Sequence, residues 1–585
     1  MNDIRRSILW VVFGLSMILL WDKWQVHNGK QATFFPTAQT AAQSEANAAA
    51  NAPTIGGEVP KAATSSDVPV AAASAGAANA SDVPGTPAVP VPAGEMVEIT
   101  TDLYKLTFNT EGGSLVGADL LKHQRSADNS APFELLRQNG EHIYVAQTGL
   151  VGASGLPTHK TPMLMVSSER ALADGQDELK VVFETVQTDG VKLVKTYTLR
   201  RGHYDIKVDH KVINQGSSAV TPQLYVQLVR DGSEPESDTP FYKTFTGPAL
   251  YSEEGKYQKV SFEDIREKDT KFEAKASDGY VAMVQHYFAS AWILGQGVSR
   301  ERFARQIGGN LYSAGALTTL PAIEPGQSES ISATLFVGPQ EEKVLESLTP
   351  GLELVKDYGW LAMLAKPLYW LLEKVHSFVG NWGWSIVLLV VLIKAAFYWL
   401  NANAYRSMAK MKAINPRIQE MRERLKDKPQ LMQQEMMKMY RDEKVNPLGG
   451  CLPILVQMPV FIALYWVLLA TVEMRNAPWI GWVTDLSTPD ALFGVIPGIN
   501  LPIGPLPIVM ALTTVFQTAL NPLPPDPLQA KMMWLMPIMF SVMFFFFPSG
   551  LVLYWITNNV LTIAQQAFIN HKMGVPVKFN LPKFS

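Results

Sequence analysis

Long apolar stretches crowd into the last third of this 585-residue chain and constrain its fold more than any other feature. A helix needs about 17–25 predominantly apolar residues to cross the hydrocarbon core of a bilayer. Five stretches approach or reach that length, at about 382–401, 449–471, 505–520, 533–548 and 550–569. They predict a core of five membrane-spanning helices, so we expect a multidomain membrane protein and not a soluble one.

The N-terminus adds a sixth apolar segment, which we expect to be an anchor over residues 1–25. Arg5 and Arg6 precede the apolar run, and Leu20-Trp21-Asp22-Lys23-Trp24 follows it. A cleaved signal peptide would show small residues at that point. The positive-inside rule then predicts an uncleaved helix with its N-terminus in the cytoplasm. A buried helix of a soluble core is the alternative, but arginine and tryptophan flanks are typical of a bilayer interface.

A linker and a folded domain are expected between the anchor and the apolar core. Residues 37–94 are dominated by Ala, Pro, Ser, Gly and Thr, a composition typical of a disordered linker. Residues 95–345 alternate apolar and polar side chains, and the runs Lys180–Val186 and Val191–Leu199 flank a Thr-Asp-Gly turn, which predicts a β-hairpin. Further strand-like runs are Tyr204–Ile213, Leu224–Val229, Tyr280–Val284, Ala291–Leu294 and Ser330–Val337. The pattern predicts an all-β sandwich domain.

The predicted β-domain carries no motif for catalysis. It has 25 Lys and Arg against 33 Asp and Glu, an acidity that argues against nucleic-acid binding. His203 and His210 are close in sequence, but no metal-ligand spacing or nucleophile motif accompanies them, so we expect surface or satisfied core histidines. A membrane-tethered carbohydrate enzyme would need paired carboxylates or a metal cluster in this domain. We expect no enzyme, cofactor, metal, specific nucleic-acid sequence or small-molecule substrate.

The charges around the apolar stretches predict the topology. Residues 401–447 hold 11 Lys and Arg against 6 Asp and Glu, whereas residues 472–505 hold Arg475 as their one basic residue. With a basic tail at 571–585, both termini are expected in the cytoplasm and residues from about 25 to 350 on the exported side. Residues 352–378 are amphipathic and predict one interfacial helix, or two short ones around Pro367, with a soluble surface helix as the alternative.

Lys394 is the most informative residue of the apolar core. It stands within the run Ile386–Phe397, ten residues after Trp384, which is about 15 Å along a helix. A lysine at that depth costs roughly 2.5–3.5 kcal/mol. A membrane protein tolerates this cost when the side chain faces a hydrated cavity, or when the side chain extends to the interface.

Other polar residues of the apolar stretches fall on helical faces, either as hydrogen-bond links between helices or as the lining of a hydrated groove. We favour the groove, because links between helices would not explain Lys394. The candidate groove residues are Lys394, Gln457, Thr513, Gln517, Trp555, Asn558, Asn559, Thr562 and Gln566.

The basic segment 402–446 predicts a cytoplasmic helical hairpin with a methionine-rich apolar stripe. Asp427-Lys428-Pro429 marks the turn. Methionine adapts to irregular apolar partners, so the stripe could contact hydrophobic segments of other polypeptides. Packing between the two helices explains it equally well. The stripe residues in question are Met408, Met411, Met421, Met432 and Met436.

Six short segments together resemble the YidC/Oxa/Alb family of membrane protein insertases, in its Gram-negative form with a large periplasmic domain. The segments are Asn381–Ser385, Ser407–Met411, Met421–Leu425, Lys444–Cys451, Gln457–Pro459 and Phe547–Trp555. In this order and combination they are highly specific. A solute transporter, the other membrane class considered, would normally show inverted repeats, and we find no internal repeat.

The resemblance implies a five-helix core with a hydrophilic groove, open to the cytoplasm and to lipid, and a periplasmic domain of the supersandwich type. It implies insertion and folding of nascent inner-membrane proteins, alone or with the Sec translocon. Ribosomes, signal-recognition machinery and membrane lipid are the other implied partners. Lys394 stands where the family usually has arginine, and Trp555 where tyrosine is common. The change at Lys394 keeps the positive charge but loses the planar fork of arginine.

Overall fold

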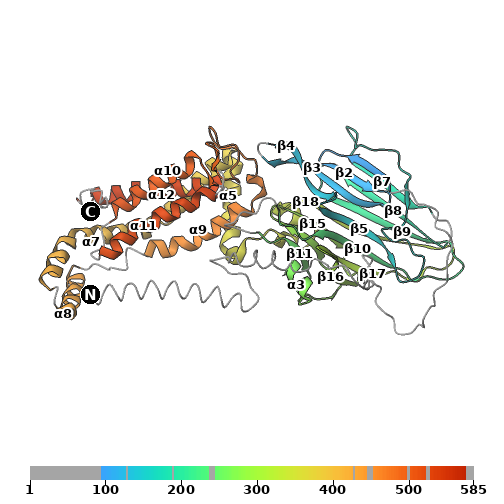
Figure 1. Cartoon of the computed structure of the whole chain (residues 1–585), viewed down its shortest axis with the longest axis horizontal. Coiled ribbons are helices and arrows are strands. Elements are labelled where there is room, and N and C mark those ends of the chain that lie inside the picture. Colours follow the sequence, from blue (N-terminus) through green and yellow to red (C-terminus); the bar gives the residue numbers. More distant parts are fainter. Residues whose placement is uncertain are drawn as a thin grey trace, which may run out of the picture. The chain divides into compact units, whose positions relative to one another are not determined.

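The computed structural model describes residues 94–126, 129–186, 190–235, 244–425, 428–443, 452–496, 501–521, 527–572 and 574. Strands occupy the blue-to-green part of the chain and helices most of the yellow-to-red part (Figure 1). The predicted anchor at 1–25, nearly all of the linker at 37–94 and most of the tail at 571–585 lie outside the described residues.

Within the described residues, the strands between Met96 and Pro339 form two nine-stranded antiparallel sheets, which we call the β-domain. The first sheet has the order β1 (Met96–Thr100), β2 (Tyr104–Asn109), β3 (Ser114–Ser126), β4 (Asn129–Gln138), β5 (Ile143–Val151), β10 (Gln223–Asp231), β17 (Leu311–Thr319), β16 (Arg300–Gly308) and β13 (Lys275–Ala276). The second has the order β12 (Gln258–Lys259), β11 (Gly247–Tyr251), β14 (Tyr280–Gln285), β15 (Phe288–Leu294), β18 (Ser328–Pro339), β9 (Asp205–Asn214), β8 (Val191–Arg200), β7 (Glu178–Thr185) and β6 (Met163–Met165).

The predicted hairpin is confirmed by the antiparallel pairing of β7 with β8, in which Val182 lies opposite Thr196. Three residues of its turn, 187–189, lie outside the described residues. The other predicted strand runs fall in β9, β10, β14, β15 and β18. These strands form where predicted because alternating side chains give each strand one face for the protein interior.

Polar side chains in the apolar interior of the β-domain tie the two sheets together. The hydroxyl of Tyr104 on β2 donates to the carbonyl of Tyr204 at 2.8 Å, next to β9 of the other sheet. The hydroxyl of Tyr197 on β8 donates to Gly113 at 2.7 Å. The indole of Trp292 on β15 donates to the carbonyl of Gln227 at 3.1 Å. These bonds satisfy polar groups that would otherwise be costly to bury.

After Pro339 the described chain consists of helices and loops, apart from one small strand pair, β19 (Val495–Ile496) with β20 (Leu501–Pro502). Short helices are α3 (Phe262–Glu267), α4 (Glu342–Leu348) and the 3₁₀ turns η1 (Leu352–Val355), η2 (Gly359–Leu361), η4 (Val472–Met474) and η5 (Phe544–Phe546). Longer helices are α5 (Ala362–Val379), α6 (Trp382–Ala396), α7 (Tyr398–Arg424), α8 (Pro429–Asp442), α9 (Leu452–Ala470), α10 (Pro505–Leu520), α11 (Pro527–Met543) and α12 (Ser549–Lys572).

Three boundaries differ from the sequence prediction. The stretch 382–401 is not one helix, because α6 ends at Ala396 and the chain bends by 66° into α7. The interfacial helix predicted over 352–378 begins only at Ala362, after two 3₁₀ turns, and continues through Pro367. Helix α11 ends at Met543 and not near 548, since Pro548 holds the preceding Phe547 in an extended conformation.

Among the described residues, no one helix combines the length and apolarity needed to cross a bilayer. The bent pair Trp382–Ala396 and Tyr398–Ser407 meets that requirement jointly, by length and composition.

Helix α12 is central to the packing of the helical part, since it contacts α6, α7, α9 and α10. The core that these helices share with α5 contains Leu389, Val467, Met510 and Val552, all at most 1% exposed. A fixed apolar core of this kind sets which faces of the helices can present polar side chains to one another.

Candidate functional site

Lys394 lies in the last turn of α6 and is half-buried against α12. Its ammonium nitrogen donates to the hydroxyl of Thr562 at 2.8 Å, and that hydroxyl donates in turn to the carbonyl of Asn558 at 2.7 Å. Within the described residues no carboxylate pairs with Lys394. The described partner of Lys394 is a neutral hydroxyl, so an ammonium group at this position would keep its capacity to attract an acidic group.

Helix α12 presents a buried row of polar side chains to α10. The amide nitrogen of Asn559 donates to the hydroxyls of Thr513 at 3.1 Å and Thr514 at 3.0 Å. Near the end of α10, the amide of Gln566 lies 3.4 Å from the side-chain oxygen of Asn521. Asn559 and Gln566 are 2% and 3% exposed, so these bonds form inside the protein. The row joins the middle of α12 to the second half of α10.

Trp555 lies on the side of α12 that faces α9, and Gln457 lies on α9 itself. The amide of Gln457 donates to the hydroxyl of Tyr554 at 3.1 Å. The ring of Trp555 is half-buried between Phe461 of α9, at 4.8 Å, and Phe544 of η5, at 4.9 Å. The structure therefore surrounds Trp555 with aromatic rings and does not align it with the hydrogen-bonded row. Gln517 is half-buried on α10.

Three buried side-chain atoms of α7 and α12 have no hydrogen-bond partner among the described residues. They are the amide oxygens of Asn558 and Gln566 and the amide nitrogen of Asn401 on α7. An unsatisfied buried polar atom costs about 1–3 kcal/mol. Water or a polar ligand would remove that cost. These atoms therefore indicate that the polar side chains here can form more hydrogen bonds than those that link the helices.

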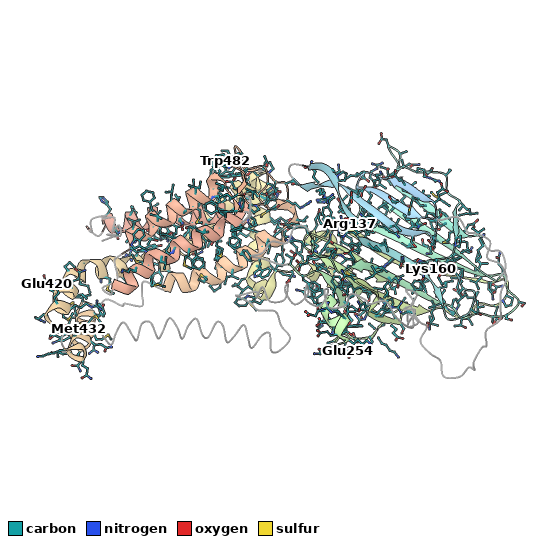
Figure 2. The ribbon with its side chains drawn as sticks, in the orientation of Figure 1. Arg137, Lys160, Glu254, Glu420, Met432 and Trp482 are labelled. Carbon is teal, nitrogen blue, oxygen red and sulfur yellow. The ribbon has the colours of Figure 1, made fainter. Side chains whose placement is uncertain are left out.

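The hairpin methionines pack between α7 and α8. Ile414 and Ile418 are buried on α7, and Met411, Met436 and Met439 pack against them. Met421 is 4% exposed and Met432 half-buried, while the side chain of Met408 lies outside the described residues. Figure 2 labels Met432 on this hairpin. The arrangement favours the packing interpretation of the stripe over contact with clients.

Two ion pairs also join the hairpin helices. Arg417 of α7 lies 3.0 Å from Glu443, and Arg424 lies 2.8 Å from Glu435 of α8. Such exposed pairs contribute about 0–1 kcal/mol each. The apolar stripe is therefore the main contact between the two helices.

Sequence reasoning missed several residues of the site. Thr514 accepts a hydrogen bond from Asn559, and the hydroxyl of Tyr554 accepts one from Gln457, so both contact predicted residues. Tyr554 precedes Asn558 by four residues, and this helical spacing is a signal that could have indicated it. Thr514 carries no such signal, because its role depends on how α10 is rotated against α12.

The histidines of the β-domain fit the predicted structural role. His210 is fully buried, and its Nε2 lies 2.9 Å from the hydroxyl of Thr148. His203 is near Asp205 at 3.3 Å. Among the described residues, no group of three or more His, Cys, Asp or Glu side chains has the arrangement of a metal site.

Comparisons with known proteins cover both parts of the chain. Residues 96–371 match the family model "YidC periplasmic domain", and residues 374–575 match "60Kd inner membrane protein". A protein named "Membrane protein insertase YidC" from Janthinobacterium sp. (strain Marseille) is 50% identical over 575 residues, 98% of this chain and 100% of that one. Its namesake from Cupriavidus metallidurans is 52% identical over 573 residues, 98% of each chain.

Among solved structures, a crystal structure described as active YidC insertase with its first transmembrane domain resolved covers 81% of this chain and 92% of that one. Its sequence identity is 18% and its TM-score 0.38. The assignment therefore depends on the two family models and on relatives that are about half identical over nearly the whole chain. Those proteins are insertases and not enzymes. The chain belongs to the YidC family of inner-membrane protein insertases.

Proposed function

We propose that the helical part of the chain accepts the polar tail of a nascent membrane protein along the row formed by Lys394, Asn558, Asn559, Thr562 and Gln566. In this proposal α6, α9, α10, α11 and α12 form a five-helix core whose groove opens to the cytoplasm and to lipid. The apolar segment of the client then leaves sideways into the bilayer. Transfer of apolar surface into lipid supplies the free energy.

The single observation that carries the proposal is the environment of Lys394. Its ammonium group is half-buried in an apolar helix and bonded to the neutral hydroxyl of Thr562. A lysine that only linked helices would gain more from a carboxylate partner than from a hydroxyl. The unsatisfied amide oxygens of Asn558 and Gln566 add capacity to bind water or peptide. Hydration there would shorten the low-dielectric path of a polar tail, and the cation would attract an acidic one.

The rival interpretation is that the same residues only link helices, since Asn559, Gln457 and Lys394 all bond to another helix. The two interpretations separate in one experiment. Two clients that differ only in the charge of their exported tail, acidic or neutral, are inserted into vesicles containing the purified chain. Lys394→Ala should slow the acidic client by about fivefold, the equivalent of roughly 1 kcal/mol.

Lys394→Arg should preserve insertion, and Lys374→Ala, which removes an exposed lysine of α5, is the matched control. If Lys394→Ala slows both clients equally and lowers thermal stability, the link between helices is the whole role of Lys394. If it leaves both clients unchanged, the electrostatic capture of acidic tails is wrong. Crosslinks from a stalled nascent chain to positions 394, 517 and 555 would map the path directly.

The topology and partners of the chain follow from the same proposal. Both termini are cytoplasmic, residues from about 25 to 350 are periplasmic, and residues 1–25 anchor the chain ahead of the linker at 37–94. The hairpin at 402–446 and the tail at 571–585 then meet ribosomes with nascent chains, and the Sec translocon cooperates for some clients. Protease added outside sealed vesicles of known orientation, with tags at each terminus, tests this topology.

A further inference from the structure

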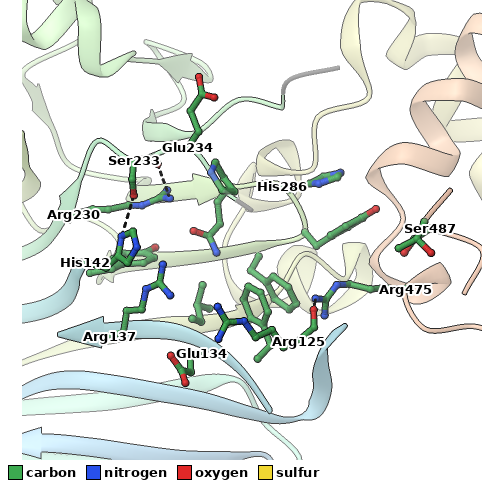
Figure 3. A pocket seen from close by; sticks show the side chains of 18 of the residues that line it. Arg125, Glu134, Arg137, His142, Arg230, Ser233, Glu234, His286, Arg475 and Ser487 are labelled. Carbon is green, nitrogen blue, oxygen red and sulfur yellow. Dashed lines mark hydrogen bonds between the residues drawn. The ribbon is translucent and has the colours of Figure 1, made fainter. Parts of the chain in front are cut away.

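A cavity of about 470 Å³ lies between the β-domain and the loop that follows η4. One wall consists of residues near the ends of β3, β4, β10, β14 and β15, and the other of residues 475–489 (Figure 3). Its size falls in the range of small-molecule and cofactor sites, about 300–1,000 Å³. Nothing in the groove proposal uses this cavity.

Specific contacts hold the two walls together. Arg475 donates to the backbone carbonyls of Gln124 and Arg125. Its guanidinium also lies over the rings of Phe133, at 4.9 Å, and Phe288, at 5.5 Å. Because cation–π and charge-assisted contacts fix both walls, the cavity is a built feature of the fold.

A third contact, His286 Nε2 to the carbonyl of Leu469 at 3.0 Å, joins the β14–β15 turn to the end of α9. Burial lowers the pKa of His286 to about 4, so this ring is neutral near pH 7. The permanent positive charges of the lining are those of its arginines.

The charged side chains of the lining are arranged by sign. Arginines point into the cavity, whereas the carboxylates either point away from it or accept hydrogen bonds from the protein. Figure 3 shows Arg125, Arg137 and Arg230 directed toward the centre of the space, with Glu134 and Glu234 pointing away from it. A cavity lined this way favours an anionic ligand.

The two other carboxylates of the lining already have donors. Asp231 accepts from the backbone of Ile143 at 2.8 Å, and Asp485 accepts from the backbone of Ser487 at 2.7 Å. These hydrogen bonds stabilise the two carboxylates in place.

Arg230 donates to the carbonyl of Ser233 at 3.5 Å and lies over the ring of Tyr144. A guanidinium carries five N–H donors, so it can bind a phosphate in addition to these partners.

The loop that supplies one wall also carries apolar side chains on its surface. Ile480 is 52% exposed, Leu492 53% and Phe493 66%. Trp482 is exposed on the same loop and labelled in Figure 2. Exposed tryptophan and apolar residues beside a polar site are typical of the level of lipid headgroups.

We propose that this cavity binds the phosphate of an anionic phospholipid headgroup, held by Arg125, Arg137 and Arg230. Guanidinium groups match phosphate in a bidentate geometry. The apolar side chains of residues 480–493 would contact the acyl chains of the same lipid. The proposal depends on the periplasmic position proposed above for the β-domain. It adds a lipid site in the outer leaflet to the insertase.

The test uses the full chain in nanodiscs of phosphatidylcholine that contain a small fraction of photoactivatable phosphatidylglycerol. Crosslinks are mapped by mass spectrometry to the peptides that carry residues 125–137 and 475–489. Arg125→Gln with Arg137→Gln should lower this labelling at least about tenfold, since each loses charge-assisted hydrogen bonds. Arg137→Lys alone should retain more than half of it. Arg266→Gln, an exposed arginine of α3, is the control and should leave labelling unchanged.

Four outcomes would overturn the proposal. They are equal labelling by a phosphatidylcholine probe, equal labelling of the double variant, full displacement by inorganic phosphate, and full displacement by an acidic peptide. The third would identify a free-phosphate site and the fourth a peptide site. Lys394→Ala should not alter the labelling, so failure of the groove proposal and failure of this one remain distinguishable.

Discussion

Two lysines show how differently the β-domain and the helical part handle a buried charge. Lys195 on β8 is fully buried, and its ammonium nitrogen donates to the backbone carbonyls of Gly112 and Thr148, both at 2.7 Å. Lys394 is half-buried and donates to one hydroxyl, that of Thr562. In the β-domain, both hydrogen bonds of Lys195 go to backbone carbonyls whose positions are fixed by the fold. Lys394 in the helical part has one hydroxyl as its described partner, which leaves donors for the polypeptide contact proposed above.

The largest effect we predict tests the β-domain side of this contrast. Burial lowers the pKa of Lys195 to about 7, from an ordinary value of 10.5. Between pH 7 and 9 the unfolded chain therefore binds a proton that the folded chain has lost, and the free energy of unfolding rises with pH. The rise is at most about 1.4 kcal/mol per pH unit. Lys195→Met should remove this rise, as measured by urea pulse proteolysis of the full chain in detergent.

Neighbouring groups do not confuse that measurement. His210 lies opposite Lys195 in the β8–β9 pair, and burial lowers its pKa to about 3, outside the pH window. Lys192→Met is the matched control, because Lys192 lies on the same strand, half-buried, and pairs with Glu184 at 2.7 Å. If Lys195→Met kept the pH slope of the unmodified chain, the burial of Lys195 would not be its cause.

A smaller effect is expected when one of the links between the sheets is removed. Tyr104→Phe deletes the hydroxyl that bonds to the carbonyls of Tyr204 and Val337 and leaves the ring in place. Loss of such buried hydrogen bonds should lower the free energy of unfolding by about 1.5 kcal/mol. The same proteolysis assay measures it at pH 7. A loss below about 0.5 kcal/mol would mean that the β-domain does not depend on its internal polar links.

The corresponding change in the helical part should cost less. Asn559→Ala removes two hydrogen bonds to Thr513 and Thr514, and links of this kind contribute about 0.6 kcal/mol each. We expect a loss of about 1 kcal/mol, measured by thermal unfolding in detergent. A double-mutant cycle with Thr514→Val isolates the pair. If Asn559→Ala lowered the free energy of unfolding by more than Tyr104→Phe does, the contrast would be reversed. The main role of the row would then be to stabilise the helical part.

The sequence predicted the two regions unequally, for physical reasons. Strands followed from alternation, which each strand carries locally. Lys195 lies on the same inward-facing side of β8 as Val191, Leu193 and Tyr197. The alternation pattern is recognised from apolar side chains, so it did not predict that a lysine would be buried there. The groove residues followed from helical spacing. The 66° bend at Phe397 did not, because no glycine or proline marks it.

Contacts that depend on two helices at once could not be predicted from spacing. The bond from Lys394 to Thr562 requires a particular rotation of α6 against α12. The position of Trp555 is set by Phe461, which is 94 residues earlier in the chain. A sequence gives the polar face of each helix, and packing decides which of those residues meet.

The smallest effect concerns the hairpin, where the helical part resembles the β-domain in using its side chains for packing. Met436 packs against buried Ile414 and Ile418. Met436→Leu conserves volume and apolarity, so a residue that only packs should tolerate it. We expect insertion rates in vesicles to change by less than about twofold, equivalent to roughly 0.4 kcal/mol. A larger loss for some clients only, with the thermal stability unchanged, would mean that the adaptable thioether contacts those clients. The hairpin would then contact the client polypeptide, as Lys394 is proposed to do. Client contact would in that case extend beyond the membrane core to a part of the chain that otherwise only packs.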